Sequence, residues 1–324
     1  MSPELPAVLG AAIGRELEGV SRKDLAVRAA RTSQAYRAAD TSERAILCRD
    51  DALAYALARL PATYAATAAV FAETARIAPG FAPTSLLDAG SGPGGGSWAA
   101  LEAWPGVAQV TWLDANAPFL ELAGRLAAGG PAALAAAQGR RVDMTAGGPW
   151  SPADLVLASY ALAEIAPARQ AALVAELWAA CAGVLVLVEP GTPAGYGRIL
   201  AARDGLIATG AQVLAPCPHQ AACPLAAPDW CHFVQRLPRS RDHLIAKEAE
   251  VPFEDEKFAY LVAARPQVTA GARNPRVLAQ PRAGKPGIDF KLCGPDGLEH
   301  RFVARRDKQA YAVARRLRWG DPFQ

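Results

Sequence analysis

The chain has 324 residues, of which 52% are hydrophobic and 20% are charged, and its formal net charge is +3. This length is sufficient for a full α/β domain of about 200 residues with smaller attachments. No apolar run approaches the roughly 18 residues of a membrane span, and no basic segment precedes an apolar one near the start, so we expect neither a membrane segment nor a signal peptide. We therefore expect a cytoplasmic protein whose six cysteines do not form disulfide bonds.

Residues 1–80 are expected to be helical and to precede the main domain. In residues 42–77 apolar residues recur at the spacing of an amphipathic helix, and Pro61 interrupts the pattern. Cys48 and Cys181 fall in apolar stretches with helical spacing, which predicts that both are core residues.

From Ser85 to Arg265 the pattern changes to alternating strands and helices. Strands are predicted at 85–90, 110–116, 141–144, 153–160, 183–191, 211–216 and 256–265, and helices at 97–104, 118–128, 167–181 and 198–210. Such alternation predicts a doubly wound, mostly parallel α/β sheet with helices on both faces. Because no helix separates the last two strands, they are expected to pair antiparallel, with a weakly patterned insertion at residues 216–255 between them.

The first strand ends in a glycine-rich turn, Asp88-Ala89-Gly90-Ser91-Gly92-Pro93-Gly94. Glycines let the backbone turn sharply and approach a ligand closely, and such a turn between a strand and a helix is a general nucleotide-binding device. The spacing Asp-x-Gly-x-Gly-x-Gly resembles motif I of the class I methyltransferases, which bind S-adenosylmethionine. The resemblance implies cofactor contacts by Asp88, Ala89, Gly90, Ser91, Gly92 and Gly94, and an ordinary turn is the alternative.

Further polar residues follow the later strands. Asp114 ends the second strand, where a carboxylate can accept hydrogen bonds from both ribose hydroxyls. In the methyltransferases that the motif resembles, Asp143 and Met144 would lie at the adenine. Ser159 and Tyr160 would lie where the methyl group meets its acceptor. The alternatives are a surface acid for Asp143 and simple packing for Ser159 and Tyr160.

The sequence names no catalytic residue. Methyl transfer to an exocyclic base amine often uses an Asn/Asp-Pro-Pro-aromatic loop, but residues 158–161 read Ala-Ser-Tyr-Ala. Transfer to a pyrimidine carbon requires a cysteine nucleophile, and Cys181 is predicted to lie in the core. Glu164 and Glu189 could act as bases or could be structural, so a cofactor-binding protein without turnover stays open.

Four cysteines remain, Cys217, Cys223 and Cys231 in the insertion and Cys293 near the end of the chain. Their spacing does not match the paired Cys-x-x-Cys knuckles of a zinc ribbon. Four thiolates in a reducing compartment suit a [4Fe–4S] cluster, and a proline follows Cys217 and Cys223, as is common at such clusters. Zinc is the competing metal, and four unrelated thiols are the third possibility. The histidines that could replace a cysteine as ligand are His219, His232 and His243.

Residues 266–324 are expected to form a basic extension, with a linker to 285, a β-hairpin at 287–306 and a helix at 307–320. From Arg265 onward there are 13 Lys and Arg against five Asp and Glu, which leaves 21 against 26 before it. This asymmetry favours contact with RNA, with a solvated basic surface as the alternative. The residues expected to contact phosphates or to stack on bases are Arg301, Arg305, Arg306, Lys308, Arg315, Arg316, Arg318, Tyr311 and Trp319.

Several of these segments together resemble one family. They are Asp88-Ala-Gly-Ser-Gly-Pro-Gly, Val188-Glu-Pro-Gly-Thr-Pro, Cys217-Pro-His, Cys223-Pro-Leu, Trp230-Cys231-His232-Phe233 and Lys291-Leu-Cys293. These segments are similar to the methyltransferase-like proteins of the mitochondrial small ribosomal subunit and their bacterial relatives. The resemblance implies a class I fold, assembly of the small ribosomal subunit with 16S-type rRNA as partner, and a [4Fe–4S] cluster on Cys217, Cys223, Cys231 and Cys293.

The sequence thus predicts an N-terminal helical region at 1–80, a class I methyltransferase domain at 81–265, and a C-terminal extension at 266–324 that completes the metal site. The predicted function is that of an S-adenosylmethionine-binding, rRNA methyltransferase-like protein of the small ribosomal subunit with a structural cluster. Two alternatives stay open, a non-catalytic assembly factor and a zinc-containing small-molecule methyltransferase. The sequence predicts no oligomeric state.

Overall fold

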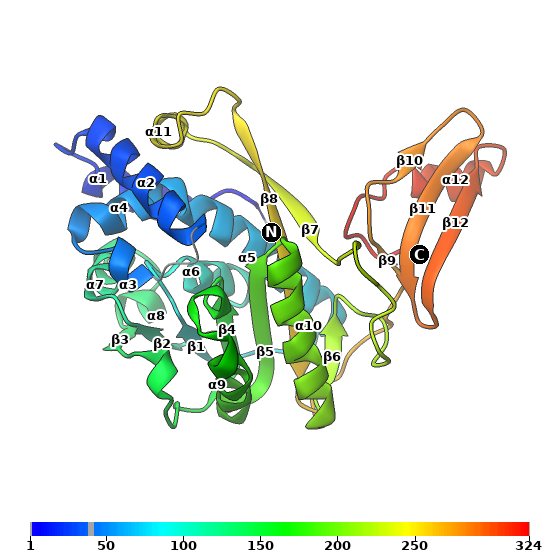
Figure 1. The fold of residues 1–324 in the computed structure, drawn as a ribbon, viewed down its shortest axis with the longest axis horizontal. Helices are drawn as coiled ribbons and strands as arrows, with labels where there is room; N and C mark the ends of the chain where they lie inside the picture. The colour runs from blue at the N-terminus through cyan, green and yellow to red at the C-terminus, as the bar shows by residue number, and fades with distance from the viewer. Residues whose placement is uncertain (1, 38–41, 324) are drawn as a thin grey trace.

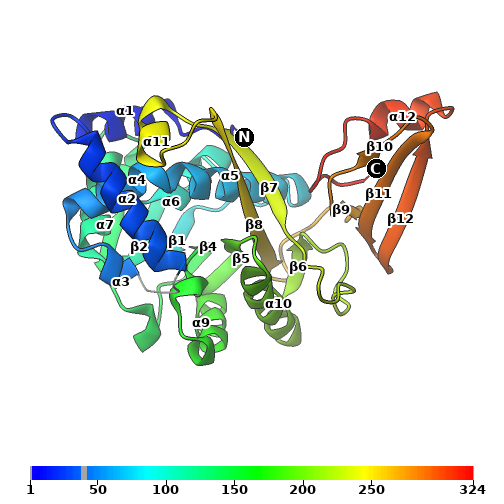
Figure 2. The ribbon, with the colours of Figure 1, turned by 45° about the horizontal axis from the view of Figure 1, so that its top comes forward.

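The computed structural model describes residues 2–37 and 42–323. A large mixed β-sheet forms the centre of the molecule, and a smaller sheet from the C-terminal residues lies to one side of it (Figure 1). The second view shows the same separation of the two sheets (Figure 2). In the described part of the chain, no helix is long and apolar enough to cross a membrane.

Helices lead into the first strand, as the sequence predicts. They are α1 (Ala7–Glu16), α2 (Arg22–Arg37), α3 (Ser42–Ala45), α4 (Arg49–Ala58) and α5 (Leu60–Ile77). Helix α4 ends at Ala58, and Pro61 lies in the first turn of α5. Backbone N–H groups in a first turn have no acceptor within the helix, so proline is tolerated there. The predicted interruption is confirmed. Cys48 precedes α4 and is exposed, so its prediction as a core residue is wrong, whereas Cys181 is buried at the start of a strand.

The doubly wound sheet is confirmed, with the strand order β3-β2-β1-β4-β5-β8-β6 and β7 paired to β8. The strands are β1 (Ser85–Ala89), β2 (Gln109–Asp114), β3 (Gln138–Arg141), β4 (Ala153–Ser159), β5 (Cys181–Pro190), β6 (Gln212–Ala215), β7 (Phe233–Pro238) and β8 (Phe253–Ala264). Strands β1 to β5 pair in parallel, and β8 runs antiparallel to β5 and β6. The predicted antiparallel pairing of the last two strands is therefore confirmed.

Alternate residues of the central strands enter two separate cores, as a period of two requires. Leu86 and Leu157 pack with the N-terminal helices on one face, and Leu87 and Val156 pack on the other. The remaining helices of this region are α6 (Gly95–Ala103), α7 (Ala117–Ala127), α8 (Ala132–Ala135), α9 (Pro167–Ala180) and α10 (Pro193–Ala208). Helices α6 and α7 join the first core, and α9 and α10 cover the second (Figure 1). Helices thus cover both faces of the sheet, so a ligand can approach it at the ends of the strands.

The insertion is more ordered than the sequence suggests. Strand β7 pairs antiparallel with the first half of β8, and α11 (Arg241–Ala246) lies between these strands in sequence. The pairing places Arg236 opposite Asp255, and their side chains form an ion pair at 2.6 Å. The sequence predicts only a weakly patterned insertion at residues 216–255, and the structure differs by adding strand β7 and helix α11. The acidic start of β8, Glu254-Asp255-Glu256, masks this strand pair in the sequence. The longest irregular stretch of the insertion is residues 216–232, which carry three of the cysteines.

Charged side chains hold α11 against the start of β8. Glu254 pairs with Lys247 and lies 3.3 Å from both Arg239 Nε and His243 Nε2. Burial by itself would raise the pKa of Glu254, but hydrogen bonds from His243 and Lys247 outweigh burial and lower the pKa to about 2. The ionised carboxylate therefore stabilises the folded insertion.

Replacing Glu254 with Gln is expected to lower the free energy of unfolding by about 2 kcal/mol at neutral pH, with solvent screening allowed for. Because the pKa in the folded state lies below the usual 4.5, this stabilisation is present above pH 4.5 and is lost as the pH falls toward 2. Urea unfolding of both forms at neutral pH and near pH 3 measures the difference, which should shrink at the lower pH. Glu250→Gln, at an exposed position of the same insertion, is the control, and a pH-independent difference would contradict the assignment.

The C-terminal residues form the second sheet and its own small core. Its elements are β9 (Arg276–Val277), β10 (Arg282–Ala283), β11 (Gly287–Gly294), β12 (Gly297–Ala304) and α12 (Lys308–Ala314). The predicted hairpin is confirmed, since β11 and β12 pair along their whole length and turn between Gly294 and Gly297. The core side chains are Val277, Ile288, Phe290, Leu292, Val303, Ala314 and Phe323. The closing helix is shorter than predicted, and the linker contributes the short strands β9 and β10.

Candidate functional site

The turn between β1 and α6 follows a path that favours glycine. Gly90, Gly92 and Gly94 have φ angles of 72°, 52° and 85°, in the left-handed region. A side chain on Gly90 would also place its Cβ 2.6 Å from the Cβ of Ala161. The N–H of Gly90 donates to the carbonyl of Leu113 at 2.8 Å, so the turn is fastened to the end of β2.

Asp88, the acid that precedes the glycines, is a buried support of the turn. It accepts a hydrogen bond from the Ser97 hydroxyl at 2.7 Å, and that hydroxyl accepts one from Trp112 Nε1 at 3.0 Å. Burial raises the pKa of Asp88 to about 7. The side chain thus joins β1 to α6 from inside the fold.

Asp114, at the end of β2, contacts the same turn from the outer side. Its Oδ2 accepts from the Gly92 N–H at 2.7 Å, and its Oδ1 accepts from the Asn116 N–H at 2.8 Å. Burial raises the pKa of Asp114, and these hydrogen bonds oppose that rise. Each carboxylate oxygen can accept more than one hydrogen bond, so Asp114 can hold the turn and accept from a ligand together.

A cavity of about 170 Å³ lies beside this turn. It is lined by these residues of the predicted cofactor site: Gly90, Gly92, Asp114, Asp143, Met144, Ser159 and Tyr160. Asp88 and Ser91 line a smaller neighbouring cavity, Ala89 is buried in β1, and Gly94 precedes α6. The fold therefore brings residues from the ends of four strands, β1 to β4, to one edge of the sheet, which is where ligands of such sheets bind.

Asp143 and Met144 form the part of the cavity wall that follows β3. Asp143 Oδ1 accepts from the Thr145 N–H at 2.8 Å and from the Thr145 hydroxyl at 2.7 Å. Both bonds go to one oxygen, which leaves the other oxygen as an acceptor for an amine. The methyl group of Met144 would lie 3.3 Å from a Cβ on Gly90, so Met144 covers the glycine turn.

Ser159 and Tyr160, after β4, are both tied to neighbouring elements. The Ser159 hydroxyl lies 2.9 Å from the Thr67 hydroxyl of α5. Tyr160 has a φ of 59°, a costly conformation for a residue other than glycine, and its hydroxyl donates to Glu256 Oε1 at 2.8 Å. Burial raises the pKa of Tyr160 well above its usual value. Tyr160 is thus a neutral donor that fixes the cavity wall to β8.

The two acids considered as bases differ in their access to the cavity. Glu189 is fully buried, and its Oε2 accepts from Arg198 Nε at 2.5 Å. Glu164 lines the cavity and accepts from the N–H of Ser42 at 2.7 Å. Burial raises the pKa of Glu164 to about 7. Of the two, Glu164 is therefore placed to exchange a proton with a bound ligand.

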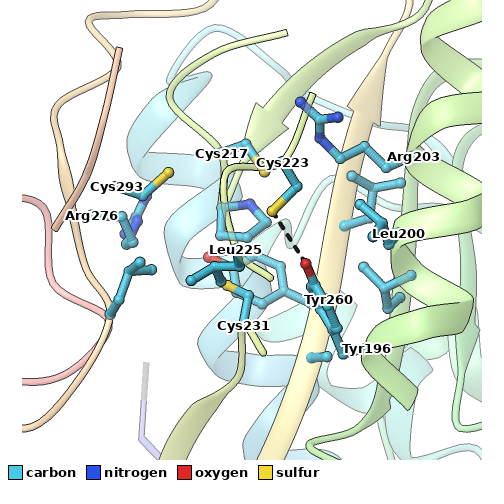
Figure 3. Close-up of a pocket in the computed structure, with 15 residues that line it drawn as sticks. Tyr196, Leu200, Arg203, Cys217, Cys223, Leu225, Cys231, Tyr260, Arg276 and Cys293 are labelled. Atoms are coloured by element: carbon cyan, nitrogen blue, oxygen red, sulfur yellow. Dashed lines mark hydrogen bonds between the residues drawn. The ribbon is translucent and has the colours of Figure 1, made fainter. Parts of the chain in front are cut away.

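The four remaining cysteines converge on one pocket, although they come from separate segments (Figure 3). Cys217 follows β6, Cys223 and Cys231 lie in the irregular part of the insertion, and Cys293 is on β11. Tyr196 of α10 also lines the pocket, with its hydroxyl 3.2 Å from Cys223 Sγ. Burial, together with the neighbouring Cys217 and Cys223, raises the pKa of Cys293 to about 12. The pocket joins the large sheet to the C-terminal hairpin.

Two buried arginines that the sequence does not single out approach these thiols from two sides (Figure 3). Arg203 of α10 and Arg276 of β9 both line the pocket, and each is 3% exposed. Among the residues that the structure describes, the Nε of each arginine has no hydrogen-bond partner. Arg276 also forms an ion pair with Glu73 of α5. A buried cation is stable only beside compensating negative charge. Four thiolates around a metal centre carry such charge, so this residue set fits a metal–thiolate centre.

The thiols of the described residues do not form a ready-made ligand set for a single zinc ion. With Zn–S bonds of about 2.3 Å, the sulfurs of a tetrahedral site lie about 3.8 Å apart. Over residues 2–37 and 42–323, no group of three or more Cys, His, Asp or Glu side chains is arranged to hold a single metal ion. His219 Nε2 lies 3.4 Å from Cys293 Sγ, whereas His232 stacks on Trp230, and His243 contacts Glu254 in the insertion.

The aromatic residues expected to stack on RNA bases pack against the protein. Trp319 is half-buried and meets His232 edge to face, with the ring centres 4.6 Å apart. Tyr311 is half-buried beside the C-terminal core, and the Arg305 guanidinium lies 5.6 Å from its ring. Both rings are thus partly covered by the protein itself, and their stacking on RNA bases stays a prediction.

The sheet order, with β8 as the antiparallel strand, defines a class I methyltransferase-like fold, and the glycine turn and the acid after β2 lie at its usual cofactor edge. The sequence model of the family described as "Mitochondrial small ribosomal subunit Rsm22" matches residues 49–324. This chain belongs to that family.

One relative is the human protein named "Ribosome assembly protein METTL17, mitochondrial". It is 32% identical over an alignment 300 residues long, which covers 83% of this chain. The chain spans 61% of the length of that relative.

Solved structures with a similar fold include the magnesium protoporphyrin IX methyltransferase of Synechocystis with bound S-adenosylmethionine. The identity is 16% and the TM-score 0.41, over 63% of this chain and 80% of that chain. The plantazolicin methyltransferase BpumL, in complex with SAH, is 13% identical, with a TM-score of 0.42 over 75% of this chain and 97% of that chain.

Proposed function

We propose that this protein binds S-adenosylmethionine in the cavity beside Asp114, acts on the small ribosomal subunit and its 16S-type rRNA, and carries a structural [4Fe–4S] cluster. The observation that carries the proposal is the shared pocket of Cys217, Cys223, Cys231 and Cys293, flanked by buried arginines. The same proposal includes the division of the chain at residues 80 and 265 and a cytoplasmic location.

The cluster would supply four iron–thiolate bonds between the insertion and the C-terminal hairpin. Arg203 and Arg276 would offset its negative charge, and their Nε–H groups are available to donate to sulfur. Protein purified under anaerobic conditions is expected to be brown, to absorb near about 400 nm, and to contain iron and sulfide. A colourless protein with one equivalent of zinc would instead support a zinc-containing small-molecule methyltransferase, particularly if it did not bind RNA.

Binding of S-adenosylmethionine is supported by the positions of Asp114 and Asp143 around the glycine turn. Asp114 is placed to accept from the ribose and Asp143 from the adenine amine. Isothermal titration is expected to show one site, and protein without measurable affinity for this cofactor would refute this part of the proposal.

Methyl transfer is a second candidate function, favoured by the position of Glu164. A carboxylate whose pKa is near 7 can accept a proton at neutral pH, and Glu164 lines the cofactor cavity. Transfer of labelled methyl groups onto 30S particles and onto 16S rRNA tests this directly. If transfer occurs, Glu164→Gln should reduce it at least about tenfold without loss of cofactor binding. Cofactor binding without transfer to either substrate would favour the non-catalytic assembly factor.

A further inference from the structure

The outer side of the C-terminal hairpin carries an exposed aromatic ring. Phe302 on β12 is 49% exposed, and it pairs across the strands with Asp289, whose neighbours Ile288 and Phe290 point into the core. A Cβ on Gly287 would lie 2.6 Å from the Phe302 ring, so the ring rests on the backbone of this glycine. Phe302 therefore presents a fixed apolar face to solvent.

Cations from two segments gather at the same end of the hairpin. The Arg305 N–H donates to the Pro286 carbonyl at 2.8 Å, and the Gly284 N–H donates to the Gly287 carbonyl at 2.8 Å. These bonds bring the loop before β11 next to the loop after β12. The exposed cations of the two loops are Arg282, Lys285, Arg305, Arg306 and Lys308, which we call the basic end.

The basic end is not neutralised by the protein itself. None of its five side chains forms an ion pair with any residue in 2–37 or 42–323. Two acids lie among them. Asp307 uses its carboxylate to accept from the Ala310 N–H at the start of α12. Asp289 lies opposite Arg282 and Phe302 in the sheet register and forms no ion pair with the described residues, so the five cations outnumber the acids beside them. The acids Asp296 and Glu299 lie toward the opposite, turn end of the hairpin. The hairpin thus has one cationic end, with Phe302 beside it.

We infer that the basic end and Phe302 form a binding surface for single-stranded RNA, an inference that rests on the proposed action on the small ribosomal subunit. The cations would contact phosphates, and a splayed base would stack on Phe302. The bases of a duplex are stacked on one another and are not available to this ring. An unpaired RNA segment therefore matches the surface better than a helix does. Two other basic residues of the tail have partners within the protein, since Lys291 pairs with Asp229 and Arg301 pairs with Glu299.

Fluorescence anisotropy with the full chain tests this surface, using an unstructured single-stranded RNA of about 12 nucleotides and a duplex of the same length. Phe302→Ala should weaken binding of the single strand by about 5-fold or more and should leave duplex binding nearly unchanged. Val313→Ala, at a position that is also 49% exposed on α12, is the matched control. Arg306→Glu should reduce affinity and the salt dependence of binding, while Arg241→Glu, an exposed position on α11 far from the hairpin, should not (Figure 1).

The possible results distinguish failure of the inferred RNA-binding surface from failure of the proposed function. If wild-type protein binds 30S particles but Phe302→Ala and Arg306→Glu bind RNA as well as the wild type does, the surface is wrong and the proposed function stands. Binding to particles without any affinity for RNA would also overturn it and would point to a protein partner. If the wild type binds neither particles nor RNA, the proposed function itself fails. Iron content and the thermal midpoint, measured for each variant, confirm that these exposed substitutions leave the fold intact.

Discussion

Protein with Cys293→Ser, purified under anaerobic conditions, is expected to lose the absorbance near about 400 nm and to release its C-terminal hairpin from the large sheet. Cys293 is the proposed ligand on β11, and the other three cysteines of the pocket come from the insertion. A structural metal site contributes about 10 kcal/mol or more to folding in small domains, and the core of the C-terminal sheet consists of only a few side chains. Loss of the metal should therefore affect this region more than any other.

Hydrogen exchange measures the release of the hairpin segment by segment. Amide protection in residues 287–304 should fall by about 100-fold or more, whereas protection in β1, β4 and β5 should change little, because these strands lie in the two large cores. Cys48→Ser removes an exposed thiol outside the pocket and is the matched control. Full iron content in the Cys293→Ser protein, or unchanged protection of the hairpin, would refute the assignment of this cysteine.

The Cys293 experiment also separates the metal from the other contacts of the tail. Arg276 pairs with Glu73 of α5, Lys291 pairs with Asp229, and Trp319 packs on His232. These contacts remain when Cys293 is replaced. A hairpin that loosens although they are intact must therefore depend on the metal centre. The exposed pair between Lys291 and Asp229 is expected to add little by itself.

The parts of the fold that could be predicted are those that short stretches of sequence determine. Strands β1, β4 and β5 are apolar on both faces, so their sequences predict buried strands without any knowledge of their neighbours. The turn at Gly90 is predicted by the spacing of its own glycines. Strand β7 could not be predicted, because its sequence has no apolar alternation. Its polar residues are explained only by their pairing with the charged first half of β8. Cys48 was misplaced because an apolar pattern does not show where a helix begins.

The same distinction applies to the candidate site. The cysteines could be grouped from their spacing and from the prolines that follow two of them, and the structure places all four on one pocket. Arg203 and Arg276 could not be found, because each lies in an ordinary segment and reaches the pocket through packing of α10 and β9. Composition predicts that Trp319 and Tyr311 stack on RNA, but it does not show that Trp319 packs on His232 or that Tyr311 packs on the C-terminal core. The exposure of Phe302 could not be predicted either. Strand alternation shows that β12 has two faces, but it does not show which face is exposed to solvent.

Asp114→Ala is expected to weaken S-adenosylmethionine binding by about 100-fold or more. A carboxylate that accepts two ribose hydroxyls contributes about 1.5–3 kcal/mol for each charged hydrogen bond. The substitution also removes the acceptors of the Gly92 and Asn116 N–H groups, so the glycine turn loses its outer support. We therefore expect a lower thermal midpoint as well as weaker binding.

Asp114→Asn keeps the shape of the side chain but has a single acceptor oxygen, so it can accept from the Gly92 N–H or from the Asn116 N–H but not from both. The thermal midpoint should therefore recover only part of the loss seen in Asp114→Ala, while titration should still show an affinity reduced by about tenfold. Glu121→Gln, at an exposed position on α7, should change neither quantity. Wild-type affinity in the Asp114→Ala protein would show that the ribose is held elsewhere, and Asp114 would then be a support of the turn alone. Because Asp114 contacts the turn directly, a defect in stability without a defect in binding would assign it that structural role.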